Sequence, residues 1–269
     1  MLADLSISSK TLALIALQPI DLAWALGLMA IAIGLSVWQQ LDLTWSLALA
    51  TGRTVLQLMI MGYLLWFIFD WKNPGAILAL VGGMLTVASI ESRNRIGKEI
   101  PHLLLWLWGS IFISTVLTLS YTTIFILRPE SWFDPQYLIP LAGIVMGNAM
   151  NGAAIAGERL VKSLQANRNE IETHLCLGAS PEQAIAQYRR DAIRAGMIPT
   201  INAMMVVGLV KLPGIITGQL LSGVNPQEAA SYQILIMFML AFATLVTTLL
   251  VIQGVYRQFF NSAAQLTFP

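Results

Sequence analysis

The feature of this sequence that most constrains its fold is a series of apolar runs, each close to the roughly 20 residues that a helix needs to cross a bilayer. We place seven such runs, at residues 20–38, 54–69, 74–90, 103–127, 137–157, 196–221 and 231–256. Charged residues make up only 11% of the 269 residues, too few to cover a water-soluble domain of this length. We therefore expect an all-α integral membrane protein with about seven transmembrane helices. Residues 1–269 should form a single membrane domain embedded in the lipid bilayer.

Lysine and arginine in the loops predict the orientation, because cytoplasmic loops carry an excess of both. With the N-terminus outside, the inner loops hold 11 of these residues and the outer loops hold 3. The inner set is Arg53, Arg93, Arg95, Lys98, Arg159, Lys162, Arg168, Arg189, Arg190, Arg194 and Arg257, and the outer set is Lys10, Lys72 and Arg128. Lys211 falls inside a predicted span. We expect the N-terminus outside, the C-terminus in the cytoplasm, and residues 158–195 in the cytoplasm.

Residues 158–195 are the only long polar segment of the chain. Its larger apolar residues have helical spacing, with one gap, at Leu160, Leu164, Ile171 and Leu175. Gly178 is predicted to end this helix, because glycine adopts the left-handed conformation that follows many helix ends. Ser180, Pro181 and Gln183 then supply a cap, a first-turn proline and a capping-box partner for a second helix. The segment is therefore predicted to be a helix-elbow-helix between the fifth and sixth spans.

The second helix of this elbow is predicted to be amphipathic as well. Its apolar stripe consists of Ala184, Ile185, Tyr188 and Ala192, and its polar stripe of Gln183, Gln187, Arg190 and Arg194. Two interpretations remain open. Amphipathic helices between spans are often ordinary surface loops. Alternatively, a compact elbow of this form could be bound by a soluble partner that moves the membrane spans.

Polar groups within the predicted spans are amides and hydroxyls, and the scarcity of acids argues against a proton pump built on carboxylates. These residues are Gln57, Asn148, Asn151, Asn202, Thr217, Gln219 and Gln233. Each could join neighbouring helices by hydrogen bonds. Asn148 and Asn151 also share a helical face beside Met146 and Met150, so this strip could instead line a pathway. Methionine is also common core filler.

Glycine and proline mark two further features of the fifth and sixth spans. Gly143 and Gly147, and likewise Gly214 and Gly218, have the spacing that lets helix backbones approach closely. Pro213 and Gly214 are predicted to break the sixth span next to Lys211. A broken helix serves as a gate or binding element in many transporters, and a kink without function is the alternative.

Several chemical signatures are absent from the sequence. The chain contains no Walker A glycine loop and no clustered histidine and cysteine set, and its single cysteine, Cys176, has no disulfide partner. We therefore predict no catalytic residue, cofactor, metal site or nucleic-acid partner. The chain is not expected to be an enzyme.

Five motifs in the C-terminal half carry a resemblance to a known family. They are GNAMNG at 147–152, ETHLCLGA at 172–179, IPTIN at 198–202, LPGIITGQ at 212–219 and YQILIMF at 232–238. In order and length they resemble the iron-export type of ABC transporter permease, which includes bacterial iron exporters and plant aluminium-tolerance half-transporters. In addition, Glu172 with Gly178 is similar to the Glu-Ala-Ala-x3-Gly loop that docks ABC importer permeases onto their ATPase. Lys211 departs from the small or neutral residue expected before Leu-Pro-Gly.

The resemblance implies a permease subunit of an ATP-driven transporter in the inner or plasma membrane, working as a homodimer with a separate ATPase subunit. Its cargo would be iron or a related metal or metal-linked solute. ATPase coupling would involve Glu172, Gly178, Ala179, Ser180 and Arg190. The substrate pathway would include Asn148, Met150, Asn151, Thr217 and Gln219, with Pro213 and Gly214 as a helix-break gate. An ATPase-independent channel or facilitator and a seven-span scaffold or receptor remain alternatives, and co-purification of an ATPase would distinguish them.

Overall fold

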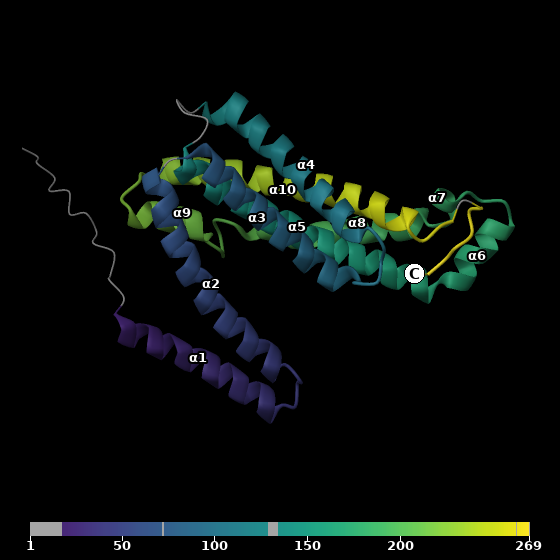
Figure 1. The fold of residues 1–269 in the computed structure, drawn as a ribbon, viewed down its shortest axis with the longest axis horizontal. Helices are drawn as coiled ribbons and strands as arrows, with labels where there is room; N and C mark the ends of the chain where they lie inside the picture. The colour runs from purple at the N-terminus through teal and green to yellow at the C-terminus, as the bar shows by residue number, and fades with distance from the viewer. Residues whose placement is uncertain (1–17, 72, 129–133, 262, 269) are drawn as a thin grey trace, which may run out of the picture. The chain divides into compact units, whose positions relative to one another are not determined.

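The computed structural model describes residues 18–71, 73–128, 134–261 and 263–268. Within these residues the regular elements are helices, and the only β-structure consists of two isolated bridges, Val207 with Lys211 and Phe260 with Leu266. The chain divides into two compact units, one formed by residues 1–71 with 217–226 and the other by residues 72–216 with 227–269 (Figure 1). Lys10 and Lys72, two of the three outer-side cations, lie outside the described residues.

The first unit contains a helical hairpin of α1 (Pro19–Trp38) and α2 (Thr44–Trp71), which pack against each other (Figure 1). Helix α2 begins ten residues before the predicted start at residue 54. Arg53, which we assigned to an inner loop, lies inside this helix, where the hydroxyl of Thr51 donates to the Leu47 carbonyl at 2.7 Å. Large apolar side chains such as Trp24 and Trp45 are more than three-quarters exposed, as lipid-facing residues are.

The second unit is a bundle around α5 (Pro135–Ala166), which contacts α3 (Pro74–Ile96), α4 (Leu103–Tyr121) and α8 (Ala186–Val206) (Figure 1). Helix α4 continues as a π-helix, Thr122–Leu127, so that the predicted run 103–127 is helical throughout and long and apolar enough to cross a membrane. Helix α10 (Pro226–Arg257) joins α4 through a 2.6 Å hydrogen bond from the Thr247 hydroxyl to Ser114.

Close helix packing in this bundle involves glycines that were not predicted, in addition to the predicted Gly143, whose added Cβ atom would lie 2.9 Å from Met84 Cε. A Cβ atom on Gly196 of α8 would lie 2.7 Å from the carbonyl oxygen of Gly152 on α5, so the two backbones meet there. A Cβ atom on Gly147 would meet no atom within 4 Å. No close backbone approach within the chain is therefore present at Gly147, because a four-residue spacing shows which glycines share a face but not what covers that face.

The run 196–221, predicted as the sixth span, is not one continuous helix. Helix α8 ends at Val206, and α9 (Gly214–Leu221) begins after a turn in which Gly208 has φ of +81°. The predicted break at Pro213 and Gly214 is present, although it begins seven residues before Gly214, at Val207. Six helices among the described residues are long and apolar enough to cross a membrane: Ile20–Trp38, Thr44–Trp71, Pro74–Ile96, Leu103–Leu127, Pro135–Ala166 and Pro226–Arg257.

Candidate functional site

The predicted elbow at Gly178 is present, and its capping interactions are those expected from the sequence. Gly178 has φ of +90°, and the Ala179 N–H donates to the His174 carbonyl at 3.0 Å, which closes the end of α6 (Arg168–Cys176). The Ser180 side chain accepts from the Gln183 N–H at 3.3 Å, and the Gln183 side chain accepts from the Ser180 N–H at 2.9 Å. This capping box starts α7 (Pro181–Ala184). Figure 1 shows α6 and α7 at the same end of the bundle as the C-terminus.

The apolar faces of the elbow are buried as predicted. Leu160, Leu164, Ile171, Ile185 and Ala192 are fully buried and share one core cluster with Val251, Ile252 and Val255 of α10. The helices are interrupted at two places that the pattern did not predict. One is Asn167, whose side-chain amide donates to the Ser163 carbonyl at 2.9 Å, and the other is Ile185 between α7 and α8. The gap in the apolar spacing of the first helix falls at Asn167.

The residues predicted to contact a partner lie on the accessible side of the elbow. Gly178, Ser180 and Arg190 are exposed, and Ala179 is half-buried. The Glu172 carboxylate accepts a 2.6 Å hydrogen bond from Arg168 one turn away, and 41% of its side chain remains exposed. Leu177, beside Gly178, is 80% exposed. The sequence pattern missed Leu177 because it falls in the turn, outside both helical stripes.

Tyr188 of α8 links the two arms of the elbow. Burial, followed by the hydrogen bond to Glu170 of α6 and the negative charge of that carboxylate, raises the pKa of the Tyr188 phenol above its usual value. The Tyr188 phenol thus donates to the Glu170 carboxylate, which is a contact between α8 and α6.

A polar network that sequence reasoning missed joins the elbow to the end of α10. The Tyr256 hydroxyl donates to Glu182 Oε1 at 2.6 Å, and the Gln253 side-chain amide donates to the Tyr256 oxygen at 3.2 Å. Arg189 donates to Gln253 Oε1 at 2.9 Å, and its guanidinium lies 4.9 Å from the centre of the Tyr256 ring. We call these four residues the Glu182–Tyr256 network. Its sequence signal in α10 is a glutamine and a tyrosine three residues apart, Gln253 and Tyr256, at the end of a largely apolar helix.

The predicted pathway residues separate into different environments. The Asn148 side-chain amide donates to the Thr200 hydroxyl oxygen at 2.9 Å and to the Thr244 hydroxyl oxygen at 2.7 Å, so it ties α5 to α8 and α10. Asn151 is exposed, and its Oδ1 lies 3.5 Å from Arg95 Nη1. Met150 packs against the core between α3, α4 and α5. We call Asn148, Thr200 and Thr244 the amide-hydroxyl cluster.

The remaining predicted residues lie near the helix break. Thr217 and Gln219 belong to the first unit, in α9, and Oε1 of Gln219 is buried without a hydrogen-bond partner among the described residues. Lys211 lies in the exposed turn and not within a helix. Pro213 is half-buried, and Gly214 begins α9. The structure thus brings Asn148 together with two hydroxyls that were not singled out.

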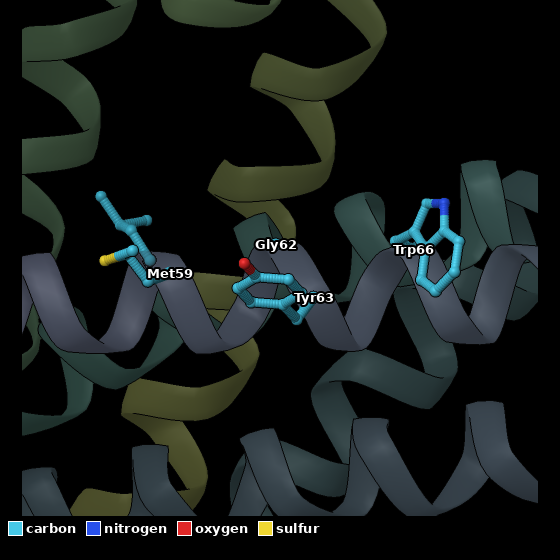
Figure 2. Close-up of a pocket in the computed structure, with 5 residues that line it drawn as sticks. Met59, Gly62, Tyr63 and Trp66 are labelled. Carbon is cyan, nitrogen blue, oxygen red and sulfur yellow. The ribbon is translucent and has the colours of Figure 1, made fainter. Parts of the chain in front are cut away.

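An open hollow of about 480 Å³ lies along one face of α2 in the first unit. Figure 2 shows that Met59, Tyr63 and Trp66 frame it, with Gly62 leaving the gap between them. All of its lining residues come from α2, and the larger side chains are more than half exposed. An apolar face of this kind is what contact with lipid or with another membrane helix requires. Among the described residues no group of three or more histidine, cysteine, aspartate or glutamate side chains could hold a metal ion.

The fold and these sites define a class of protein. The long apolar helices of the described chain, an interrupted helix and an amphipathic elbow make an all-helical, multi-pass protein of the cell membrane. The chain belongs to the uncharacterised protein family UPF0014, which it matches over residues 19–260.

Three relatives illustrate the family. UPF0014 membrane protein slr1647 of Synechocystis is 52% identical over 254 residues, which are 94% of this chain and 98% of that protein. "Probable iron export permease protein FetB" of Escherichia coli is 34% identical, covering 91% of this chain and 93% of that protein. Protein ALUMINUM SENSITIVE 3 of Arabidopsis thaliana is 32% identical, covering 91% and 88% respectively. No solved structure matches the chain. The resemblance inferred from the five sequence motifs is therefore confirmed at the level of the family.

Proposed function

We propose that this protein is the membrane permease subunit of an ATP-driven exporter whose ATP hydrolysis is supplied by a separate ATPase subunit. The observation that carries the proposal is the elbow around Gly178. It is a capped, well-packed polar structure with an exposed tip, and its Glu182 is hydrogen-bonded at 2.6 Å to Tyr256 of a membrane helix. A partner that moves the tip therefore also moves α10, in addition to α5 and α8, which flank the elbow in sequence.

The tip of the elbow has the chemistry of a docking site. Leu177 offers an exposed apolar side chain at the turn, and Glu172, Ser180 and Arg190 surround the turn with polar groups. A central apolar anchor with a polar rim is the usual arrangement of a protein interface. The ATPase is proposed to bind here, in contact with Glu172, Gly178, Ala179, Ser180 and Arg190.

In this proposal the protein crosses the membrane seven times, with the N-terminus outside and the elbow in the cytoplasm. The last part of α8 and α9 together form the sixth, interrupted span, with Pro213 and Gly214 at its gate. The excess of lysine and arginine in the loops on the elbow side supports this orientation. Asn148, Met150, Asn151, Thr217 and Gln219 are proposed to contribute to the pathway.

The cargo is proposed to be iron or a related metal or metal-linked solute, and the permease is proposed to act as a homodimer that presents two equal elbows to a pair of ATPases. The name of the Escherichia coli relative, which speaks of iron export, supports the cargo. The chain carries out no chemical reaction of its own in this proposal.

Co-purification tests the proposal. The tagged full chain, expressed in its own host and extracted in mild detergent, is expected to bring down one ATPase of about 200–250 residues, on the usual size of a single domain. Vesicles holding both proteins should move iron only with ATP. If the chain purifies without an ATPase and iron crosses the vesicles without ATP, it is a channel or facilitator. If the chain purifies alone and nothing crosses, it is a scaffold or receptor.

A further inference from the structure

After α10 the chain turns back on itself in a short loop, whose described residues are 259–261 and 263–268. We call it the C-terminal loop. The Thr267 N–H donates to the Phe259 carbonyl at 2.8 Å, and the Asn261 N–H donates to the Gln265 carbonyl at 3.1 Å. These two hydrogen bonds close the loop, so its last residues lie beside the end of α10.

The apolar side chains of the C-terminal loop pack into the core of the elbow. Phe259 is 1% exposed and Leu266 is 7% exposed, and both belong to the core cluster that contains Leu164 and Ile171. The half-buried ring of Phe268 packs against the same cluster and meets the Phe259 ring edge-on, with ring centroids 5.7 Å apart and an angle of 74° between the planes. Aromatic pairs favour this arrangement, so the place of the Phe268 ring is well defined.

Arg168, the first residue of α6, lies over the Phe268 ring. Its guanidinium carbon is 5.6 Å from the ring centroid, which is close enough for a cation–π contact. Nε of the same guanidinium donates to Glu172 Oε1 at 2.6 Å. Contacts therefore run without interruption from Glu172, through Arg168 and Phe268, to Phe259, which follows the end of α10.

The two arms of the elbow are thus held against the end of α10 by separate contacts. The Glu182–Tyr256 network holds α7, and Arg168 together with Phe268 holds α6. A cation–π contact requires the face of an aromatic ring, whereas apolar packing requires only buried apolar surface. The side chain at position 268 can therefore separate the two effects, because leucine keeps apolar bulk without a ring and tyrosine keeps the ring.

We propose that Arg168 and Phe268 are positioning residues, which hold α6 against the C-terminal loop and thereby fix the place at which the Glu172 carboxylate meets a partner. Neither residue was predicted from the sequence to act at the elbow. The role of this placement in partner binding rests on the proposed docking of an ATPase at the elbow. The contact that holds α6 in place does not depend on that proposal.

Amide hydrogen exchange of the full chain in lipid nanodiscs tests the contact without an ATPase. Phe268→Leu should raise the exchange rate of the α6 amides at residues 172–176 about two- to fivefold, the factor expected from the loss of one exposed cation–π contact. Exchange in α7 should not change, because the Glu182–Tyr256 network still holds that arm. Phe268→Tyr should exchange at the wild-type rate. Unchanged exchange of α6 in Phe268→Leu, or an equal rise in α6 and α7, overturns the proposal.

Phe260→Leu is the matched control for the packing of the loop. Phe260 also packs against the core cluster, but among the described residues no cation–π contact involves it. This variant should leave the exchange of α6 at the wild-type rate. A rise equal to that of Phe268→Leu would show that α6 depends only on the general packing of the loop, which contradicts the proposal.

A double-mutant cycle tests whether Arg168 and Phe268 act through each other. Arg168→Gln should raise the exchange of α6 at least as much as Phe268→Leu, because it removes the contacts with both Phe268 and Glu172. Adding Phe268→Leu to Arg168→Gln should then produce no further rise. If the two effects multiply instead, the residues act independently and the proposal is wrong.

ATPase binding to the same variants tests the positioning role. Phe268→Leu should lower the affinity for the ATPase by a factor similar to its rise in exchange, and Phe268→Tyr should bind like the wild type. Unchanged affinity of Phe268→Leu, together with faster exchange in α6, contradicts the positioning role. If the wild-type chain binds no ATPase, the proposed function fails, and the exchange of α6 alone then decides whether Arg168 and Phe268 hold this arm.

Discussion

The Tyr256 hydroxyl lies 2.6 Å from Glu182 Oε1, although 74 residues separate them in the chain. Tyr256 is in the last turns of α10, and Glu182 is in the short helix that follows Gly178. The contact gives the proposed docking elbow a direct hydrogen bond to a membrane helix. It also gives the coupling proposal a residue that can be changed without touching the docking tip.

We predict that Tyr256→Phe uncouples transport from ATP hydrolysis while leaving ATPase binding intact. Phenylalanine keeps the ring beneath Arg189 but loses the hydroxyl that bonds Glu182. The hydrogen bond should contribute about 1 kcal/mol to stability, less than is usual for a bond to a charged group, because Glu182 is exposed. The measurements are iron moved per ATP hydrolysed in vesicles and the amount of ATPase that co-purifies.

Two further variants control this prediction. Glu182→Gln keeps an acceptor for the Tyr256 hydroxyl and should retain most of the coupling. Tyr121→Phe removes the hydroxyl of a tyrosine that is 60% exposed on another helix and should have no effect. A normal ratio of transport to hydrolysis in Tyr256→Phe would show that the network is structural only.

We predict that Gly178→Val weakens ATPase association. The residue has φ of +90°, which a β-branched side chain adopts only at a cost above about 1 kcal/mol, so the turn should change its shape. Gly178→Asn is the matched control, because asparagine tolerates the left-handed conformation. Glu172→Lys reverses a charge beside the same turn and should also weaken binding. For each variant, the amount of ATPase that is pulled down with the permease from membranes measures the association. If a variant is inserted into the membrane and recovers as much ATPase as the wild type, the coupling role is contradicted.

Much of the elbow could be predicted because its determinants are local. The left-handed Gly178, the capping box of Ser180 and Gln183, and the buried stripe through Ile185 each depend on residues within a few positions of one another. The Glu182–Tyr256 network could not be predicted, because its partners come from distant parts of the chain. The start of α2 was missed because Arg53 was counted as an inner-loop cation, although the helix extends back past it to Thr44.

The amide-hydroxyl cluster could not be predicted either, because its three residues come from three different helices. Asn148 was recognised as a polar residue at depth, but Thr200 and Thr244 were not, since a threonine within an apolar helix usually bonds its own backbone. Thr244 does so, donating to the Leu240 carbonyl at 2.7 Å, and in addition its oxygen accepts from Asn148. The sequence shows which residues are polar, but the helix crossing at Gly152 and Gly196 decides which of them meet.

We predict that Gly196→Leu and Gly147→Leu have different effects. At Gly196 an added side chain meets the Gly152 carbonyl and the Ala156 methyl, so α5 and α8 must move apart where they cross. The free energy of unfolding in detergent, measured by thermal unfolding, should therefore fall by several kcal/mol. At Gly147 no atom lies within 4 Å, and the single chain should tolerate leucine. If this face instead contacts a second copy, Gly147→Leu should shift the mass measured in nanodiscs from dimer to monomer. A wild-type protein that is a single copy with its ATPase bound and active would exclude the proposed homodimer.

The last prediction concerns the pathway, tested with single cysteines in a Cys176→Ala background. Asn151 is exposed beside Arg95, so the thiol of Asn151→Cys should react with a water-soluble reagent in every state. Asn148 is half-buried and bonded to Thr200 and Thr244, so the thiol of Asn148→Cys should react only when ATP binding separates α5, α8 and α10. Cysteines at 217 and 219 should likewise change their reactivity with ATP if α9 lines the pathway.

Ala149→Cys supplies the control for this experiment, because Ala149 is fully buried in the core between α3, α4 and α5 and should not react in any state. Loss of the Asn148 amide removes two hydrogen bonds between helices, each contributing about 0.6 kcal/mol in a membrane protein, so Asn148→Cys should still fold. Reactivity at 148 that rises with ATP while 149 stays silent supports a pathway that opens through the amide-hydroxyl cluster. If 148, 217 and 219 remain unreactive with and without ATP, the two amides and the hydroxyl at these positions only join helices, and the cargo takes another route.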